Sequence, residues 1–319
     1  MSPFLMSQLM NLPQNPQTKL LLVAAFLVAL PTHAQQLTAR QVVERIQQAT
    51  GAQPPANTVD NFKGGDPDEK VTGIATTFLD TYAVLEKAAA DGHNLVITHE
   101  PTFYNHPDDK SLLGDDPVQA RKEAFIREHH LVVWRFHDQW HLRKPDGILE
   151  GVTAQLDWQK FQNPTEPHLF RLPPTTLAAL ESSLRQKLGA TTAFRVVGDP
   201  TMQVSGVALL PGASGELKQV KMLERSDVDV LVAGEASEWE TVEYVRDAIA
   251  QGRHKALILL GHEVSEEPGM DYCAKWLQGI FPGIPVEFLK AGSPFILQAA
   301  SESALPGGGA NAVPSAGTP

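Results

Sequence analysis

Two apolar stretches of the sequence each end at a histidine with a carboxylate close by. His99 and Glu100 follow the first stretch, and His262 follows the second, with Glu266 four residues further on. Imidazole and carboxylate groups bind divalent metal ions in proteins. Residues four apart share one face of a helix, so His262 and Glu266 could bind one ion together. The two stretches therefore predict the two halves of a metal site.

A third group repeats the spacing of four residues. His137 and His141 could both reach the same site, and Asp138 lies between them. A carboxylate in that position could be a ligand itself or could accept a hydrogen bond from a ligating imidazole. The sequence leaves open which of the three residues completes the site.

An interpretation without metal is also open for each pair. His99 could hydrogen-bond a neighbouring loop while Glu100 faces the solvent. His262 could begin a helix whose positive N-terminal end attracts Glu266. The position of both pairs at the ends of apolar stretches favours the metal site.

Short apolar stretches bounded by glycine and polar residues predict the buried strands that would position these groups. Leu95–Thr98, Leu131–Phe136 and Ala256–Leu260 each end just before a candidate ligand. Ligand sites in open α/β sheets gather at the carboxyl ends of the strands. Helical patterns of about ten to fifteen residues alternate with the strands, as is typical of βαβ units. The expected fold class is α/β, with two α/β lobes, mixed sheets and the metal site between the lobes.

The length of 319 residues and a hydrophobic content of 42% suit two lobes. The tail is rich in Gly, Ala and Pro, a composition that cannot bury enough surface to offset the entropy of ordering. The expected organisation has four parts: a signal peptide at 1–34, a first α/β lobe at 35–160, a second α/β lobe at 161–300 and a disordered tail at 301–319.

The N-terminal segment has the pattern of a secretory signal peptide. Lys19 precedes an uncharged apolar run at residues 20–30, and small residues follow up to Ala34. The run is too short to span a bilayer comfortably, although an uncleaved membrane anchor stays an alternative. We expect cleavage after Ala34, a mature protein that begins at Gln35 without stable membrane insertion, and a secreted or periplasmic location.

Charge and cysteine content exclude several classes of function. The formal net charge is -11, and nucleic-acid binding needs clustered Lys and Arg, so no nucleic-acid partner is expected. Cys273 is the only cysteine, so no internal disulfide can form and the residue is expected in the core. The segment Pro211–Gly215 lacks the Lys-Ser or Lys-Thr of a phosphate-binding loop and is expected to be a plain turn.

Taken together and in order, these motifs resemble the NIF-three-like family of dinuclear-metal proteins, often labelled GTP cyclohydrolase I type 2. The resemblance covers about Leu37 to Phe295. It is carried by four motifs: Leu95–His99, His137–His141, Val228–Glu235, and Gly261–Glu266 followed by Gly269.

The resemblance implies a set of five metal ligands: His99, Glu100, His141, His262 and Glu266. Two of them differ in type from the family pattern. Glu100 stands where the family has a second histidine, and His141 stands where it has an aspartate. The total of three imidazoles and two carboxylates is unchanged, so we interpret the differences as an exchange of ligands within the same site. His137 is a further candidate ligand, and Asp138 is the alternative ligand if His141 does not reach the metal.

The resemblance also implies a function. Two divalent metal ions (Zn, Mn or Fe) would serve a metal-dependent hydrolase in which Glu266 and Glu100 are catalytic and Glu235 lines the pocket. The expected substrate is a small molecule, nucleotide-like or phosphorylated. An exported protein would not meet cytosolic GTP, which argues against that specific activity. The family implies homohexameric rings, and a non-enzymatic exported metal-binding or scaffold protein is the alternative.

Overall fold

The structure is a computed structural model that describes residues 36–189 and 194–295. The segments predicted as a signal peptide (1–34) and as a disordered tail (301–319) lie outside the described residues. The chain divides into a short N-terminal unit, Met1–Leu37, and a second unit, Thr38–Pro319, to which the elements below belong. In the described part of the chain, no helix is long and apolar enough to cross a membrane.

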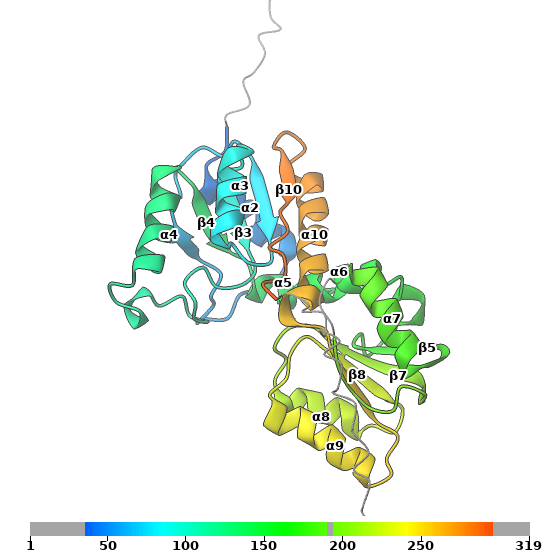
Figure 1. Ribbon diagram of the computed structural model, residues 1–319. Coiled ribbons are helices and arrows are strands. Elements are labelled where there is room, and N and C mark those ends of the chain that lie inside the picture. Colours follow the sequence, from blue (N-terminus) through cyan, green and yellow to red (C-terminus); the bar gives the residue numbers. More distant parts are fainter. Residues whose placement is uncertain (1–35, 190–193, 296–319) are drawn as a thin grey trace, which may run out of the picture. The chain divides into compact units, whose positions relative to one another are not determined.

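The first sheet has five strands in the order β1–β4–β3–β2–β10, of which only the edge strand β1 is antiparallel to its neighbour (Figure 1). The strands are Phe62–Gly64 (β1), Ile74–Thr77 (β2), Leu95–Thr98 (β3), Val132–Arg135 (β4) and Val286–Phe288 (β10). Thr98 pairs with Thr77 on one side and with Arg135 on the other. The carboxyl ends of β2, β3 and β4 are therefore level, and the segments that follow them start from the same edge.

Helices α3 and α4 pack on one face of this sheet, where Leu85 and Phe125 join Val96 and Val133 in a buried cluster. Helix α5 directly follows β4 and begins at the level edge. The helical segments associated with the first part of the chain are Ala39–Thr50 (α2), Tyr82–Ala90 (α3), Lys110–Leu112 (η2), Pro117–Glu128 (α4) and Asp138–Leu142 (α5).

The second sheet has the order β5–β7–β8–β9–β6, with a parallel centre and an antiparallel strand at each edge. Its strands are Leu169–Thr176 (β5), Arg195–Val197 (β6), Gln203–Leu210 (β7), Val230–Ala233 (β8) and Ala256–Leu259 (β9). Alternate residues of β7, β8 and β9 point into two different clusters, one on each face. Both faces of the sheet are thus covered, as apolar parallel strands require.

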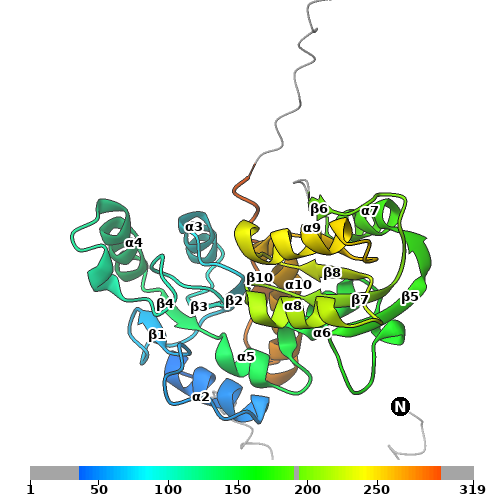
Figure 2. The ribbon, with the colours of Figure 1, turned by 90° about the horizontal axis from the view of Figure 1, so that it is seen from below.

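Helices α6 and α7 cover one face of the second sheet, and α8 and α9 cover the other (Figure 2). These elements are Gly147–Gln155 (α6), Gln159–Phe161 (η3), Leu177–Leu188 (α7), Glu216–Glu224 (α8), the π-helical turn Glu238–Val242 (η4) and Glu243–Ala250 (α9).

Helix α10, His262–Ile280, connects the two sheets. It begins just after β9 and is followed by β10, which pairs with β2 of the first sheet. The hydroxyl of Thr76 in β2 donates to the Met270 carbonyl of α10 at 2.9 Å. Helix α6 lies very close to α10, because a Cβ at Gly151 would lie 2.4 Å from the Pro268 carbonyl oxygen. The middle of α10 is therefore held against β2 of the first sheet and against α6, which packs on the second.

The predicted fold class is confirmed: the protein is α/β with two mixed sheets. Its packing crosses the boundary predicted at residue 160. Helix α6 packs in the core of the second sheet, through Leu149 and Val152, and β10 belongs to the first sheet. An apolar pattern predicts a strand or a helix but does not say which sheet it will join, so this difference could not be foreseen. Cys273 is free and buried, as expected.

Candidate metal centre

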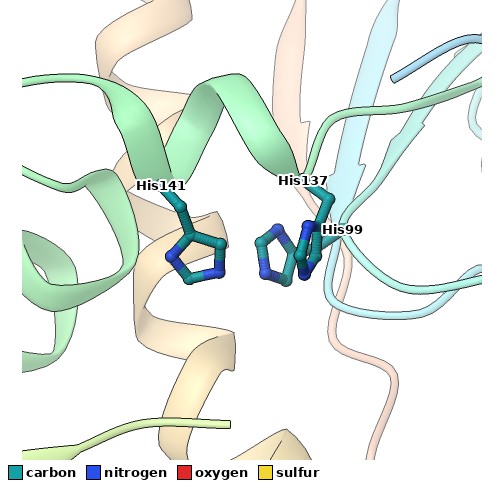
Figure 3. A group of neighbouring side chains, drawn as sticks. All are labelled: His99, His137 and His141. Atoms are coloured by element: carbon teal, nitrogen blue, oxygen red, sulfur yellow. The ribbon is translucent and has the colours of Figure 1, made fainter. Parts of the chain in front are cut away.

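Three imidazoles converge at the level edge of the first sheet (Figure 3). His99 follows β3, while His137 and His141 lie at the start and in the last turn of α5. The ring centroids are 4.7 Å (His99 to His137), 5.0 Å (His99 to His141) and 4.9 Å (His137 to His141) apart. One nitrogen from each ring lies within 4.8 Å of the other two. This is the separation at which three imidazoles can hold one metal ion.

Each of these imidazoles has a fixed acceptor at Nδ1. The acceptors are the Phe136 carbonyl for His99 (3.1 Å), Asp138 for His137 (2.9 Å) and Asp146 for His141 (3.0 Å). An acceptor at Nδ1 favours the tautomer with its proton there and leaves the lone pair of Nε2 for a metal. Nε2 of His99 is fully buried and has no hydrogen-bond partner among the described residues. A buried polar atom of this kind requires a partner, and a metal ion fits that requirement.

Two carboxylates link the imidazole cluster to His262. An oxygen of Glu266 lies 3.1 Å from Nε2 of His262 and 3.5 Å from Nε2 of His99. An oxygen of Glu100 lies 3.5 Å from Nε2 of His262 and 3.7 Å from Nε2 of His137. His99, Glu100 and Glu266 form a second group with metal-ligand spacing, which shares His99 with the first. The ligands are thus arranged as two overlapping groups.

The charge of His262 reflects a local excess of carboxylates. Burial opposes protonation of this imidazole, but the neighbouring carboxylates of Glu100, Glu235 and Glu266 together outweigh that effect and raise its pKa to about 12. Without a metal, a proton on His262 therefore supplies the positive charge that the carboxylates attract. A divalent cation would supply the same charge and would leave the imidazole free as a ligand.

The imidazoles of the first group differ in basicity. Burial, together with repulsion from the neighbouring imidazoles, lowers the pKa of His99 well below its ordinary value and lowers that of His137. Burial also opposes protonation of His141, but the hydrogen bond to Asp146 and the attraction of Asp146, Glu266 and Glu100 together outweigh burial and raise the pKa. His99 and His137 are therefore neutral at neutral pH, which is the form that binds a metal.

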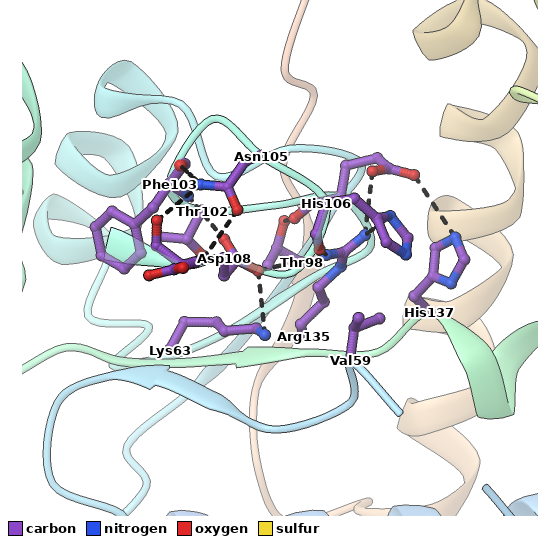
Figure 4. Close-up of polar contacts among 12 residues, drawn as sticks. Val59, Lys63, Thr98, Thr102, Phe103, Asn105, His106, Asp108, Arg135 and His137 are labelled. Atoms are coloured by element: carbon purple, nitrogen blue, oxygen red, sulfur yellow. Dashed lines mark hydrogen bonds and ion pairs between the residues drawn. The ribbon is translucent and has the colours of Figure 1, made fainter. Parts of the chain in front are cut away.

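A buried arginine, Arg135, whose polar contacts are drawn in Figure 4, holds Glu100 in place. Arg135 is fully buried, donates through Nε to the His99 carbonyl at 3.1 Å and lies 3.3 Å from the second oxygen of Glu100. Its other terminal nitrogen lies 3.3 Å from Asp108, which in turn pairs with Lys63 at 3.1 Å. One oxygen of Glu100 is thus fixed by Arg135, while the other faces the imidazoles.

Helix α5 is fixed by a carboxylate at its N-terminus. The two oxygens of Asp60 accept hydrogen bonds from the backbone amides of His137, Asp138 and Gln139 at 2.7 to 2.8 Å. The side chain of Asp138 accepts from Nδ1 of His137 with one oxygen and from the Val59 amide with the other. Asp138 therefore orients His137, and both His137 and His141 face the cluster.

The turn Pro211–Gly215, predicted to be a plain turn without a role, packs against the site. A Cβ at Gly212 would lie 2.1 Å from a Glu266 carboxylate oxygen and 3.2 Å from Nε2 of His262. The Gly212 amide donates to the Ser265 hydroxyl at 2.9 Å. Only glycine leaves room for the carboxylate here, so this turn of the second sheet shapes the site.

A cavity of about 950 Å³ opens beside the cluster, with Glu100 and His262 in its wall. Glu235, predicted to line a pocket, is half-exposed in the same wall, with an oxygen 3.7 Å from Nδ1 of His262. The neighbouring imidazole of His262 lowers the pKa of Glu235, although burial opposes this. The cavity therefore gives a small molecule access to the candidate ligands.

The structure brings all six predicted ligands together: His99, Glu100, His137, His141, His262 and Glu266. Sequence reasoning missed the residues that orient them, namely Asp60, Arg135, Asp146 and Gly212. Asp146 precedes Gly147 and caps helix α6, with hydrogen bonds to the Ile148 and Leu149 amides. An Asp-Gly pair before an apolar run could have indicated that cap, but not the contact with His141.

An Asp146→Asn substitution tests the orienting contact. Asparagine keeps the helix cap because its oxygen can accept from the same amides. Its amide group cannot be the anionic acceptor for Nδ1 of His141, so metal affinity is expected to fall roughly 10- to 100-fold. Competition with a metal-sensitive fluorescent chelator would measure it. Asp116→Asn is the matched control, because Asp116 caps α4 in the same way without contacting the candidate metal ligands; equal losses in both variants would contradict the assignment.

A family model described as Duf34/NIF3 (NGG1p interacting factor 3) matches residues 41–293. The chain belongs to the Duf34/NIF3 family. The resemblance deduced from the four motifs is thereby confirmed, over nearly the span expected from the sequence. No protein with a curated description matches this NIF3-family chain.

Several solved structures share the fold of this NIF3-family protein. A Bacillus cereus protein related to NIF3 is 14% identical, with a TM-score of 0.68, and covers 83% of this chain and 100% of its own. A Staphylococcus aureus hypothetical protein is 15% identical, with a TM-score of 0.66 and the same coverage. A Thermus thermophilus protein is 16% identical, with a TM-score of 0.60, and covers 81% of this chain and 100% of its own. At these identities the likeness shows the fold alone.

Proposed function

We propose that this protein binds two divalent metal ions and hydrolyses a small molecule. The observation that carries the proposal is the convergence of four imidazoles and two carboxylates beside a cavity of about 950 Å³. The mixture of nitrogen and oxygen ligands suits Zn, Mn or Fe. The buried, unpartnered Nε2 of His99 and the excess of carboxylates around His262 support a resident cation.

The first metal would be held by His99, His137 and His141, and the second by His262 and Glu266, with Glu100 between the two groups. Such ions supply Lewis acidity, which polarises the bond to be cleaved and favours the loss of a proton from water. Glu100 and Glu266 each direct an oxygen toward two imidazoles, and these carboxylates would accept the proton of the attacking water and pass it to the leaving group. Arg135 fixes Glu100 for this role.

A hydrolase assay tests the proposal. The mature protein, from Gln35 onward, is loaded with Zn, Mn or Fe and assayed against chromogenic esters, amides and phosphodiesters. We expect hydrolysis that a chelator removes and that added metal restores, and we expect Glu100→Ala to abolish it. Stably bound metal without hydrolysis of any of these substrates would contradict the enzyme and support the alternative, a non-enzymatic metal-binding or scaffold protein.

We also propose that the protein is exported and assembles into homohexameric rings. The charged residue and apolar run before Ala34 support export, and the family resemblance supports the ring. N-terminal sequencing of the protein from its native host is expected to start at Gln35, and light scattering is expected to give six times the monomer mass. A start at Met1, or a monomer in solution, would contradict the respective proposal.

A further inference from the structure

The cavity beside the cluster has apolar and aromatic walls. Phe78, Tyr104, Leu260, Val264 and Phe295 contribute to them. Tyr104 and Phe295 are 57% and 76% exposed, so their rings offer apolar surface to a ligand in the cavity. Phe78 lies with its ring centroid 5.4 Å from that of His262. An apolar, ring-bearing ligand would cover these surfaces next to the candidate metal ligands.

The charged groups in the same walls are mostly acidic. Glu100, Glu235 and Glu263 line the cavity, and Arg195 is the one lysine or arginine among the described lining residues. Its guanidinium lies 2.7 Å from a carboxylate oxygen of Glu238, so its charge is already paired. A nucleoside triphosphate is usually held by metal ions together with several cationic side chains, so metal ions at the candidate ligands would not be enough on their own. The described walls of this cavity do not offer such cationic side chains.

Backbone amides do not take the place of cationic side chains in binding a phosphate. A helix N-terminus can bind an anion, and α10 begins at the cavity, but acidic Glu263 stands in its first turn. The amides of Ala291 and Gly292, which also line the cavity, donate to the Glu267 carboxylate at 2.9 and 3.3 Å. The start of α10 and these two amides therefore already have an acidic neighbour.

We infer that the cavity takes a substrate with an apolar, ring-bearing body and a neutral or cationic polar group, and that it discriminates against polyphosphates. The inference rests on the proposed function for the identity of the site. It replaces the nucleotide-like or phosphorylated substrate expected from the sequence. Glu235 is the specificity-determining residue, because one oxygen of its half-exposed carboxylate lies 3.7 Å from Nδ1 of His262 and the other can pair with an ammonium group in the cavity.

Binding of three probes to the metal-loaded mature protein tests the inference. The probes are 2-(2-naphthyl)ethylamine, which is cationic, 2-(2-naphthyl)ethanol, which is neutral, and GTP. We expect both naphthyl probes to bind, with the amine roughly three- to fivefold tighter, as a half-exposed ion pair would give. GTP is expected not to displace the neutral probe. Fluorescence titration measures all three.

Two variants test whether the Glu235 carboxylate causes the preference for the amine probe. Glu235→Gln is expected to remove the preference for the amine and to leave the affinity for the alcohol unchanged. Glu243→Gln is the control, because Glu243 pairs with Arg246 on α9 and does not line the cavity. Displacement of the alcohol by GTP, or no binding of either naphthyl probe, would overturn the inference. Probe binding without any hydrolysis in the assay above would instead leave the inference standing and contradict the proposed enzyme.

Discussion

A Glu266→Gln substitution is expected to empty the second metal position and to abolish metal-dependent activity. Glu266 is 3% exposed, and its oxygen lies within 3.5 Å of nitrogens on both His99 and His262. Glutamine keeps the size of the side chain but removes the charge that would hold a divalent cation. Replacing an orienting neighbour of a ligand costs 10- to 100-fold in metal affinity, so loss of a ligand should cost more than about 100-fold. Competition with a fluorescent chelator would measure the affinity.

The matched control is Glu267→Gln, at the next position of the same helix. Glu267 is also buried, but it accepts hydrogen bonds from the Ala291 and Gly292 amides and belongs to neither candidate ligand group. This variant is expected to bind metal like the unmodified protein, even if it unfolds more easily. Full metal affinity in Glu266→Gln, or an equal loss in both variants, would show that Glu266 is not a ligand.

A Gly212→Ala substitution is expected to cost metal binding through a steric contact. The added methyl group would lie 2.1 Å from a Glu266 oxygen, well inside any normal contact, so the carboxylate must move. Gly212 also has a positive φ of 64°, which costs a residue with a Cβ about 1–2 kcal/mol. We therefore expect a modest loss of unfolding free energy and a loss of metal affinity comparable to that of Glu266→Gln. Chemical denaturation and chelator competition measure the two effects.

Gly215→Ala separates the steric effect from the backbone effect. Gly215 lies in the same turn with a positive φ of 81°, but a Cβ there would meet nothing within 4 Å. We expect Gly215→Ala to lower the free energy of unfolding about as much as Gly212→Ala does, and to leave the metal affinity unchanged. If both variants lost metal equally, strain in the turn rather than contact with Glu266 would be the cause.

The sequence could predict the candidate ligands because each belongs to a strand end or to a short helical spacing. His99 and His262 follow apolar stretches that became β3 and β9, which lie in different sheets, and ligand sites gather at the carboxyl ends of such strands. His137 and His141 lie four apart on α5, so their convergence follows from helical geometry. These are local rules, and they hold here.

The remaining parts of the site depend on contacts between distant segments. Asp60 caps a helix that begins 78 residues later, and the Gly212 amide bonds a hydroxyl 53 residues away. Strand β10 pairs with β2 across more than two hundred residues. Neither composition nor periodicity encodes which distant partner a segment meets, so the orienting residues and the sheet of β10 became visible only in the structure.

Metal content is the measurement that tests the central claim most directly. The protein from Gln35 onward is reconstituted with Zn, Mn or Fe, freed of excess ion and analysed by elemental mass spectrometry. The arrangement of His99, Glu100, His137, His141, His262 and Glu266 predicts about two metal ions per chain. A folded protein that retains no metal after reconstitution would contradict it.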